Sequence, residues 1–207
     1  MNKHLFSNDA TIDYYNKNAV SYFEQTVNLD MSSIYPAFLN LIAKGGHILD
    51  AGCGSGRDTK YFLGLGYKVT AIDASKEMVK LSSEFTGEST LHMDFQELSF
   101  QDSFDGIWAC ASLLHISSIG IESVLSKLLS SLKSQGILYL SLKIHDREKH
   151  DREKVIEGRL FSFYSEESIQ NLLSRFVSVK IIEVWKTFNS KKTQMNQEWL
   201  NIIARKT

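Results

Sequence analysis

The stretch ILDAGCGSGRDTKYF, residues 48–62, contains the residues of this chain that are best suited to bind a ligand. An apolar run ends in Asp50, and Gly52, Gly54 and Gly56 follow at alternate positions. Glycine loses more conformational freedom on ordering than any other residue, so three this close together indicate that a ligand or another backbone approaches there. A tight turn without a ligand is the alternative.

The spacing of these glycines argues against two common phosphate-binding loops. A loop of the GxxxxGK[ST] type needs a lysine for the phosphates, and that lysine is absent. A dinucleotide-binding loop has the spacing GxGxxG, whereas this chain has GxGxG, with Arg57 where the third glycine belongs. We therefore expect no nucleotide hydrolysis at this loop.

A second acidic residue, Asp73, ends the next strand-like segment, YKVTAID. In nucleoside-binding sheets the ribose is bound by an acid at this place, beyond the carboxyl end of a strand. A carboxylate can accept hydrogen bonds from two vicinal hydroxyls. Asp73 is otherwise a turn or helix-capping acid before ASKEM. Together with the glycine loop, it predicts a nucleoside site.

Strand-like and helix-like segments alternate along the chain and predict an α/β fold with a mostly parallel sheet. The expected strands are 47–51, 67–73, 90–93, 104–111, 136–144, 177–185 and 198–206. The expected helices are a preface at 11–43 that is interrupted near the sole proline, then 57–66, 75–85, 121–133 and 167–176. In such a sheet, Asp50 and Asp73 come at the same edge.

Composition places the chain among ordinary globular proteins of one domain. It has 207 residues, a net charge of −1 and 43% hydrophobic residues, which gives no general attraction to nucleic acid or to an anionic membrane. Its two cysteines are too few for a disulfide framework or a structural zinc site. No signal-like or membrane-spanning apolar run is seen. We expect a cytoplasmic protein that does not associate with membranes.

An exact tandem pentapeptide, HDREKHDREK, occupies residues 145–154. On a helix its two histidines would be about 140° apart, so they could not bind one metal ion as a pair one turn apart does. We predict no metal site. The segment is either a solvated loop or a lid beside the substrate, since it directly follows a strand's carboxyl end.

The motifs ILDAGCGSGRD, VTAIDAS, LHMDFQEL, FDGIWACASLLHI and LKSQGILYLSL resemble, in order, those of class I S-adenosylmethionine-dependent methyltransferases. The likeness covers residues 46–143 and is closest to the small bacterial tellurite-resistance and quinone-type branch. It implies a doubly wound, mostly parallel, seven-stranded sheet with an antiparallel last strand and amino-terminal helices. It also implies one domain: a helical lid (1–44), a cofactor-binding core (45–143) and a substrate-side loop, helix and closing hairpin (144–207).

By this resemblance the cofactor is S-adenosylmethionine and the product S-adenosylhomocysteine. The implied cofactor-binding residues are Asp50, Gly52, Cys53, Gly54, Gly56, Arg57, Asp73, Ala74, Met78, Asp94, Phe95, Cys110, Ala111 and Leu113. Asp73 would bind the ribose hydroxyls, and Asp94 the adenine amino group. Alternatives stay open: Asp94 as a turn acid, Phe95 as a core residue, and Arg57 as a surface residue at the start of a helix.

The acceptor side is predicted from position in the family. His115 is the candidate general base, which is needed only if the acceptor must lose a proton. A structural, hydrogen-bonded histidine is the alternative. The candidate substrate-binding residues are Tyr14, Tyr15 and Tyr22 in the amino-terminal lid, and Arg159, Phe161 and Tyr164.

Absent motifs narrow the acceptor. No Asn-Pro-Pro-aromatic sequence, Pro-Cys pair or acidic pair follows the fourth strand, which argues against amino methylation of bases, cytosine C5 methylation and a magnesium-dependent catechol site. We expect a small-molecule acceptor and a monomer or homodimer. A tRNA or protein methyltransferase and a non-catalytic cofactor-binding module are the alternatives.

Overall fold

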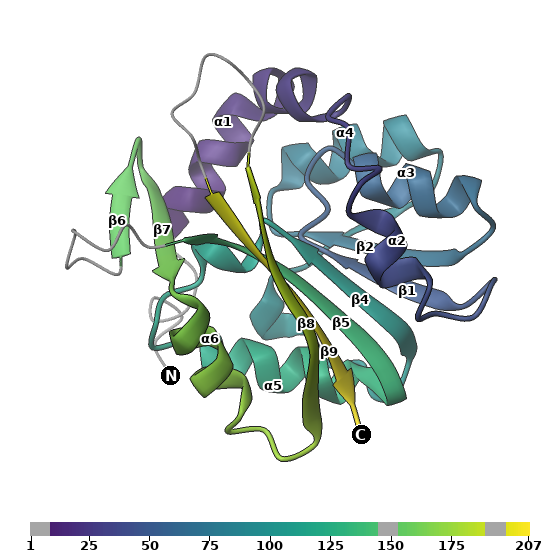
Figure 1. Ribbon diagram of the computed structural model, residues 1–207. Helices are drawn as coiled ribbons and strands as arrows, with labels where there is room; N and C mark the ends of the chain where they lie inside the picture. Colours follow the sequence, from purple (N-terminus) through teal and green to yellow (C-terminus); the bar gives the residue numbers. More distant parts are fainter. Residues whose placement is uncertain (1–8, 145–152, 189–197) are drawn as a thin grey trace.

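The computed structural model describes residues 9–144, 153–188 and 198–207, with helices on both faces of a mostly parallel sheet (Figure 1). The helices are α1 (Asp9–Thr26), α2 (Tyr35–Leu39), α3 (Arg57–Gly64), α4 (Lys76–Thr86), α5 (Ile121–Ser131) and α6 (Glu166–Leu173), with short 3-10 helices η2 (Phe95–Glu97) and η3 (Leu113–His115). The strands are β1 (His47–Ala51), β2 (Lys68–Asp73), β3 (Thr90–His92), β4 (Phe104–Cys110), β5 (Leu132–Ile144), β6 (Glu153–Ile156), β7 (Arg159–Tyr164), β8 (Val179–Phe188) and β9 (Glu198–Lys206).

The central strands follow the order β3-β2-β1-β4-β5, with β9 next to β5 and β8 next to β9. The first five are parallel, and β9 is antiparallel to both of its neighbours. The predicted doubly wound α/β sheet with an antiparallel last strand is confirmed. Strand order reverses between β1 and β4, and open α/β sheets bind ligands at the carboxyl ends beside such a reversal.

Two strands, β6 and β7, were not predicted, since a charged loop was expected after residue 144. They form an antiparallel hairpin whose second strand pairs with the end of β5 (Figure 1). Glu157 and Gly158 both have positive φ, of 53° and 81°, as the preferred two-residue hairpin turn requires. Most of the duplicated pentapeptide lies outside the described residues, so neither interpretation of it is tested.

Each face of the sheet has its own apolar core. Tyr35 and Phe38 of α2 and Phe62 of α3 cover one face, where Trp108 stacks on Tyr139 with ring centroids 3.9 Å apart. Helices α5 and α6 cover the other face with leucine and isoleucine side chains. The apolar side chains of α5 are buried, among them Val124, Leu125 and Leu128. Helix burial on both faces explains why the central stretches of β4 (residues 106–109) and β5 (residues 136–140) are apolar.

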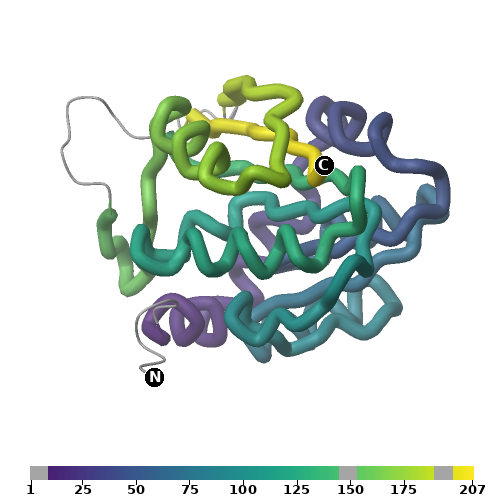
Figure 2. The backbone as a smooth tube through the Cα atoms, turned by 90° about the horizontal axis from the view of Figure 1, so that it is seen from below, coloured from purple at the N-terminus to yellow at the C-terminus, as the bar shows by residue number. Residues whose placement is uncertain are grey.

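The predicted amino-terminal helical segment is two helices, α1 and α2. Helix α1 packs against α4 and against β7, both of which are distant from it in the sequence (Figure 2). It therefore bridges α4 and the hairpin strand β7. Among the described residues, no helix is long and apolar enough to cross a membrane.

Gly56 begins α3 with a left-handed φ of 75° and lies close to α4. A Cβ there would be 2.5 Å from Ser82 Oγ and 2.9 Å from Thr86 Cγ2. The third glycine of the loop is thus needed for packing between two helices.

Gly56→Ala should lower the free energy of unfolding by more than about 2 kcal/mol, because it adds overpacking to an unfavourable φ. Gly66→Ala is the matched control: its φ is 85°, but its Cβ would meet nothing within 4 Å. The comparison is made by urea unfolding. Equal losses in the two variants would contradict the packing argument.

Candidate functional site

The glycine loop lies between the carboxyl end of β1 and the start of α3 (Figure 1). The amides of Gly52 and Cys53 both donate to the carbonyl oxygen of Ile72, at distances of 3.0 and 2.9 Å. A Cβ on Gly52, whose φ is 81°, would be 2.5 Å from Ser112 Cβ and 3.4 Å from Phe95 Cζ. Gly52 is therefore packed closely against Ser112, and a side chain at this position would not fit.

Asp73 joins the loop to the end of β2. One carboxylate oxygen accepts from the Gly54 amide at 2.9 Å, and the other accepts from the Ser75 amide at 2.8 Å. Burial raises the pKa of Asp73, against the lowering effect of these amides. Two carboxylate oxygens have about four acceptor sites, so the group retains capacity for further donors. The structure brings Asp73 and the glycine loop together as predicted.

Asp50 is buried inside the loop and accepts from the Thr59 hydroxyl at 2.6 Å. Burial raises its pKa to about 8, and the negative charge of Asp58 contributes in the same direction. Its carboxylate is thus directed at the chain's own α3, which organises the loop from within.

Arg57 does not lie on the surface. It donates through Nε and Nη2 to the two oxygens of Asp58, at 2.7 and 2.8 Å. The same carboxylate accepts from the Tyr35 hydroxyl at 2.6 Å and from Trp108 Nε1 at 2.8 Å. Asp58, which the sequence analysis missed, therefore fixes Arg57, α2 and β4 to the start of α3.

The residues predicted to lie near the adenine make different contacts in the structure. Asp94 caps η2 by accepting from the Gln96 amide at 2.8 Å, so the turn-acid role is real. Phe95 is partly buried against the core beside the loop. Met78 is buried and Ala74 accepts from His92 Nε2 at 3.1 Å. Of these, Phe95 comes nearest to the glycine loop, at Gly52.

The end of β4 forms the centre of the sheet edge. Ala111 has a φ of 53°, which is unfavourable for a residue with a Cβ, and its amide donates to Ser141 Oγ at 2.8 Å. Burial raises the pKa of the Cys110 thiol to about 12, so the thiol is protonated and unreactive. Leu113 is buried beneath this turn. Cys53, in the loop, contacts Ser82 Oγ at 3.5 Å.

His115 is partly buried between α1 and β7. Its Nδ1 is 2.6 Å from the carbonyl oxygen of Leu160, which can only accept, so Nδ1 is protonated. Its Nε2 therefore accepts from the Tyr15 hydroxyl at 2.8 Å. Burial lowers the pKa of His115 to about 4, and the ring is neutral.

The three tyrosines of α1 contact different parts of the structure. Tyr22 lies against the glycine loop, 3.5 Å from where a Gly54 Cβ would be. Tyr15 packs edge-on against Tyr22, with centroids 4.9 Å apart, and reaches His115. Tyr14 stacks under Arg159, whose guanidinium carbon is 4.1 Å from the ring centroid.

The predicted wall of Arg159, Phe161 and Tyr164 is only partly assembled. Arg159 and Phe161 are two residues apart on β7, so their side chains lie on the same face of the strand. The centroid of the Phe161 ring lies 4.9 Å from that of the His115 ring. Tyr164 is an odd number of residues further, so its side chain points to the opposite face of the strand. It is buried there near Glu153 of β6.

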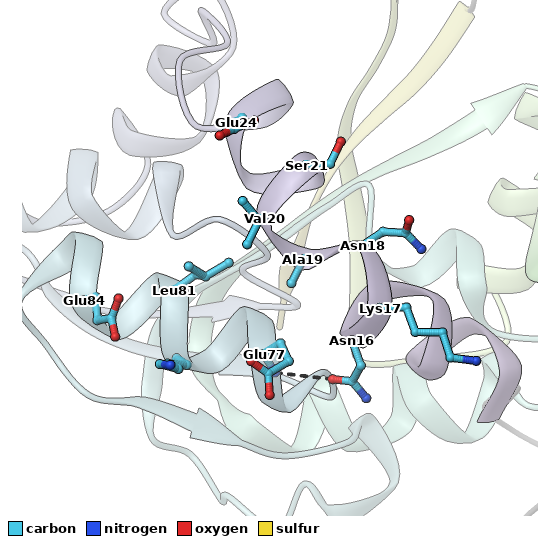
Figure 3. Close-up of a pocket in the computed structure, with 11 residues that line it drawn as sticks. Asn16, Lys17, Asn18, Ala19, Val20, Ser21, Glu24, Glu77, Leu81 and Glu84 are labelled. Atoms are coloured by element: carbon cyan, nitrogen blue, oxygen red, sulfur yellow. Dashed lines mark hydrogen bonds between the residues drawn. The ribbon is translucent and has the colours of Figure 1, made fainter.

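A separate pocket lies between α1 and α4 (Figure 3). Asn16 accepts there from Ser75 Oγ at 2.8 Å and from the Glu77 amide at 3.3 Å. Its polar lining of asparagine, lysine and glutamate includes none of the residues predicted to act on a ligand. We interpret this pocket as the space left where α1 packs against α4.

The chain is similar to known proteins over the part that contains the glycine loop and Asp73. Residues 49–140 match the family model described as a methyltransferase domain. The chain is 30% identical over 154 residues to O-methyltransferase cnsE of Penicillium expansum, covering 69% of this chain and 55% of that protein. It is 33% identical over 104 residues to the ubiquinone biosynthesis O-methyltransferase of Xanthomonas campestris pv. campestris, covering 47% and 43%. The chain spans about half the length of these curated relatives.

Two solved structures share the fold. The 1,6-didemethyltoxoflavin-N1-methyltransferase of Burkholderia thailandensis, with its substrate and S-adenosylhomocysteine bound, superposes with a TM-score of 0.75 at 23% identity, covering 96% of this chain and 88% of that one. Magnesium protoporphyrin IX methyltransferase of Synechocystis PCC 6803, with S-adenosylmethionine bound, gives 0.72 at 17% identity, covering 100% of both chains. At these identities the likeness concerns the fold.

Asp58→Asn should lower the free energy of unfolding by about 3–5 kcal/mol, because it leaves the buried Arg57 charge without a counter-charge. The control is Asp102→Asn, whose side chain is 69% exposed and pairs with Lys206. We expect that variant to lose less than about 1 kcal/mol in urea unfolding. A loss at Asp58 as small as at Asp102 would show that the ion pair is dispensable.

Acid should destabilise the fold through His115. Its pKa is about 4 in the folded chain against an ordinary 6.5, so the unfolded state binds the proton first. The contribution is complete above pH 6.5 and is lost as the pH falls towards 4. His115→Gln should remove about 3 kcal/mol of this pH dependence in urea unfolding. His92→Gln, at an exposed histidine, is the control; equal pH slopes for wild type and His115→Gln would refute the assignment.

Proposed function

We propose that the chain, whose residues 49–140 match the methyltransferase domain model, transfers a methyl group from S-adenosylmethionine to a small molecule. The product from the cofactor is S-adenosylhomocysteine. The two O-methyltransferase relatives and the two folds solved with S-adenosylmethionine or S-adenosylhomocysteine support this proposal. The observation that carries it is the contact of the Asp73 carboxylate with the Gly54 amide, which links the tips of two adjacent parallel strands.

The residues at this edge fit the cofactor. The backbone of Gly54, where a Cβ would meet only Tyr22 within 4 Å, suits the close approach of a nucleoside, and Asp73 has acceptor sites left for two ribose hydroxyls. Asp94 uses one oxygen for its cap, so the other is suited to the adenine amino group. When bound, S-adenosylmethionine supplies an activated methyl group. Alignment of acceptor and methyl can contribute roughly 7–11 kcal/mol to such a reaction.

Two of the predicted cofactor residues have other functions in this proposal. Gly56 packs α3 on α4, and Arg57 is bound by Asp58, so both act by shaping the loop. Conversely, Tyr22 covers the loop and joins the cofactor side. The helical segment 1–44 then acts as a cover over both halves of the site, with the core at 45–143 and the acceptor side at 144–207.

We propose oxygen as the acceptor atom, on the similarity to two O-methyltransferases, and the quinone-type branch as the nearest group. His115 and Tyr15 lie on the acceptor side. A pKa of about 4 makes His115 a weak base at neutral pH, so it is better suited to orient the Tyr15 hydroxyl than to remove a proton from a neutral hydroxyl. The two free cysteines support a cytoplasmic location.

Calorimetry with S-adenosylhomocysteine tests the cofactor proposal. Asp73→Asn should weaken binding by about tenfold or more, because a charged acceptor for the ribose hydroxyls is lost. Asp105→Asn, near the opposite end of β4, is the matched control and should bind as the wild type does. Tight binding of NAD with none of S-adenosylhomocysteine would contradict the proposal.

Turnover separates an enzyme from a binding module. A panel of small hydroxylated aromatic compounds is incubated with protein and S-adenosylmethionine, and release of S-adenosylhomocysteine is measured. We expect release with at least one compound. Binding without release across the panel favours the non-catalytic module, and salt-sensitive retention on immobilised RNA favours an RNA substrate.

A further inference from the structure

Lys143 is a cation at the carboxyl end of β5, directly after the apolar and mostly buried stretch of residues 136–142. It pairs with Trp199 of β9 on one side and with Phe163 of β7 on the other. Side chains of paired residues share a face of the sheet, so a lysine lies between two aromatic residues at this edge. Three strands that are remote in sequence are needed to make this arrangement.

Lys143 and Arg159 contact the same aromatic ring. Lys143 Nζ is 3.9 Å from the centroid of Phe161 and 5.9 Å from that of Trp199. The Arg159 guanidinium carbon is 5.1 Å from the Phe161 centroid and 4.1 Å from that of Tyr14. Two like charges are therefore close together in aromatic surroundings, and burial together with the charge of Arg159 lowers the pKa of Lys143 to about 8.

Negative charge is scarce around these two cations. Arg159 Nη2 pairs with Glu157 at 2.9 Å, but that carboxylate is 67% exposed. Arg159 Nε is buried with no hydrogen-bond partner among the residues that the structure describes. Within the same residues, no carboxylate lies within ion-pair distance of Lys143. A buried donor without an acceptor is unfavourable, so Arg159 Nε has capacity for an acceptor that is not among the described residues.

The cluster borders the proposed site of methyl transfer. Ser141, whose hydroxyl accepts from the Ala111 amide, lies on the same face of β5 as Lys143 and about 7 Å before it along the strand. Phe161 also contacts the His115 ring, which bonds to Tyr15. An anion beside Lys143 and Arg159 is therefore placed on the acceptor side, away from Asp73 and Asp94.

We propose that the methyl acceptor is a planar aromatic anion, a carboxylate or a phenolate, whose charge is bound by Lys143 and Arg159 and whose ring lies among Phe161, Trp199 and Tyr14. This inference rests on the proposed function. In the transfer, a lone pair of the anionic oxygen forms the new C–O bond, and the S–C bond breaks with its electron pair remaining on sulfur. The oxygen is already ionised, so no base is required, which agrees with the weakly basic His115.

The test is calorimetry with three probes: 4-hydroxybenzoate, 4-nitrophenolate above its own pKa, and neutral 4-hydroxybenzamide. We expect the wild-type protein to bind at least one anion, and to bind the amide at least about tenfold more weakly. Binding of only the carboxylate or only the phenolate identifies which anion is taken. Equal affinity for all three, or no binding of either anion, would overturn the inference.

Variants locate the anion. Lys143→Met and Arg159→Gln should each weaken anion binding by about tenfold or more, and Lys143→Arg should retain it. Lys133→Met, at the other end of β5, and Arg175→Gln, whose ion pair with Glu122 is also 2.9 Å long, are the matched controls. Unchanged anion affinity in Lys143→Met would refute the assignment, and so would a loss of anion affinity in the controls as large as in the cluster variants. Thermal unfolding establishes that each variant is folded.

Each variant is also titrated with S-adenosylhomocysteine. The anion titrations are made without S-adenosylhomocysteine as well as with it. We expect S-adenosylhomocysteine affinity to be unchanged in Lys143→Met; a tenfold loss would assign the cluster to the cofactor and overturn the inference. If the wild-type protein does not bind S-adenosylhomocysteine, the proposed function fails, and anion selectivity measured without it still decides whether the cation cluster binds planar anions.

Discussion

The buried ion pair between Arg57 and Asp58 is the constraint on which the rest of the site depends. A charged group in the interior is stable only when it is paired and its hydrogen bonds are satisfied. Asp58 meets this condition with Arg57, Tyr35 and Trp108, which belong to α3, α2 and β4. Because Asp58 is the second residue of α3, these contacts fix where the helix starts and hence how the glycine loop must turn to reach it.

The loop is constrained from its other side by β2. The Ile72 carbonyl and the Asp73 carboxylate together accept from three amides of the loop. Backbone donors that face a carboxylate, and a bare backbone that faces the sheet edge, give a surface suited to a neutral polar ligand such as a nucleoside. This explains why the site needs no phosphate-binding lysine.

Helix α1 connects the two halves of the site. Tyr22 lies over Gly54 while Tyr15, two helical turns earlier, bonds to His115. The hairpin β6–β7 supplies the other partners on this side, through the Leu160 carbonyl, Arg159 and Phe161. The proposed cofactor side is thus formed by the sheet itself, and the proposed acceptor side by elements outside residues 49–140, which match the methyltransferase domain model.

The sequence by itself determined the order of the helices and of the strands other than β6 and β7, and the position of the glycine loop and Asp73, because these depend on local periodicity, glycine conformation and strand ends. The tertiary structure decided the partners. Asp58 collects donors from residues 23 and 50 positions away, and Tyr15 meets His115 across 100 positions. Lys143 acquires its neighbours only through the register of β5 with β7 and β9. Such contacts leave no periodic trace in a sequence, since chain folding rather than spacing makes distant side chains adjacent.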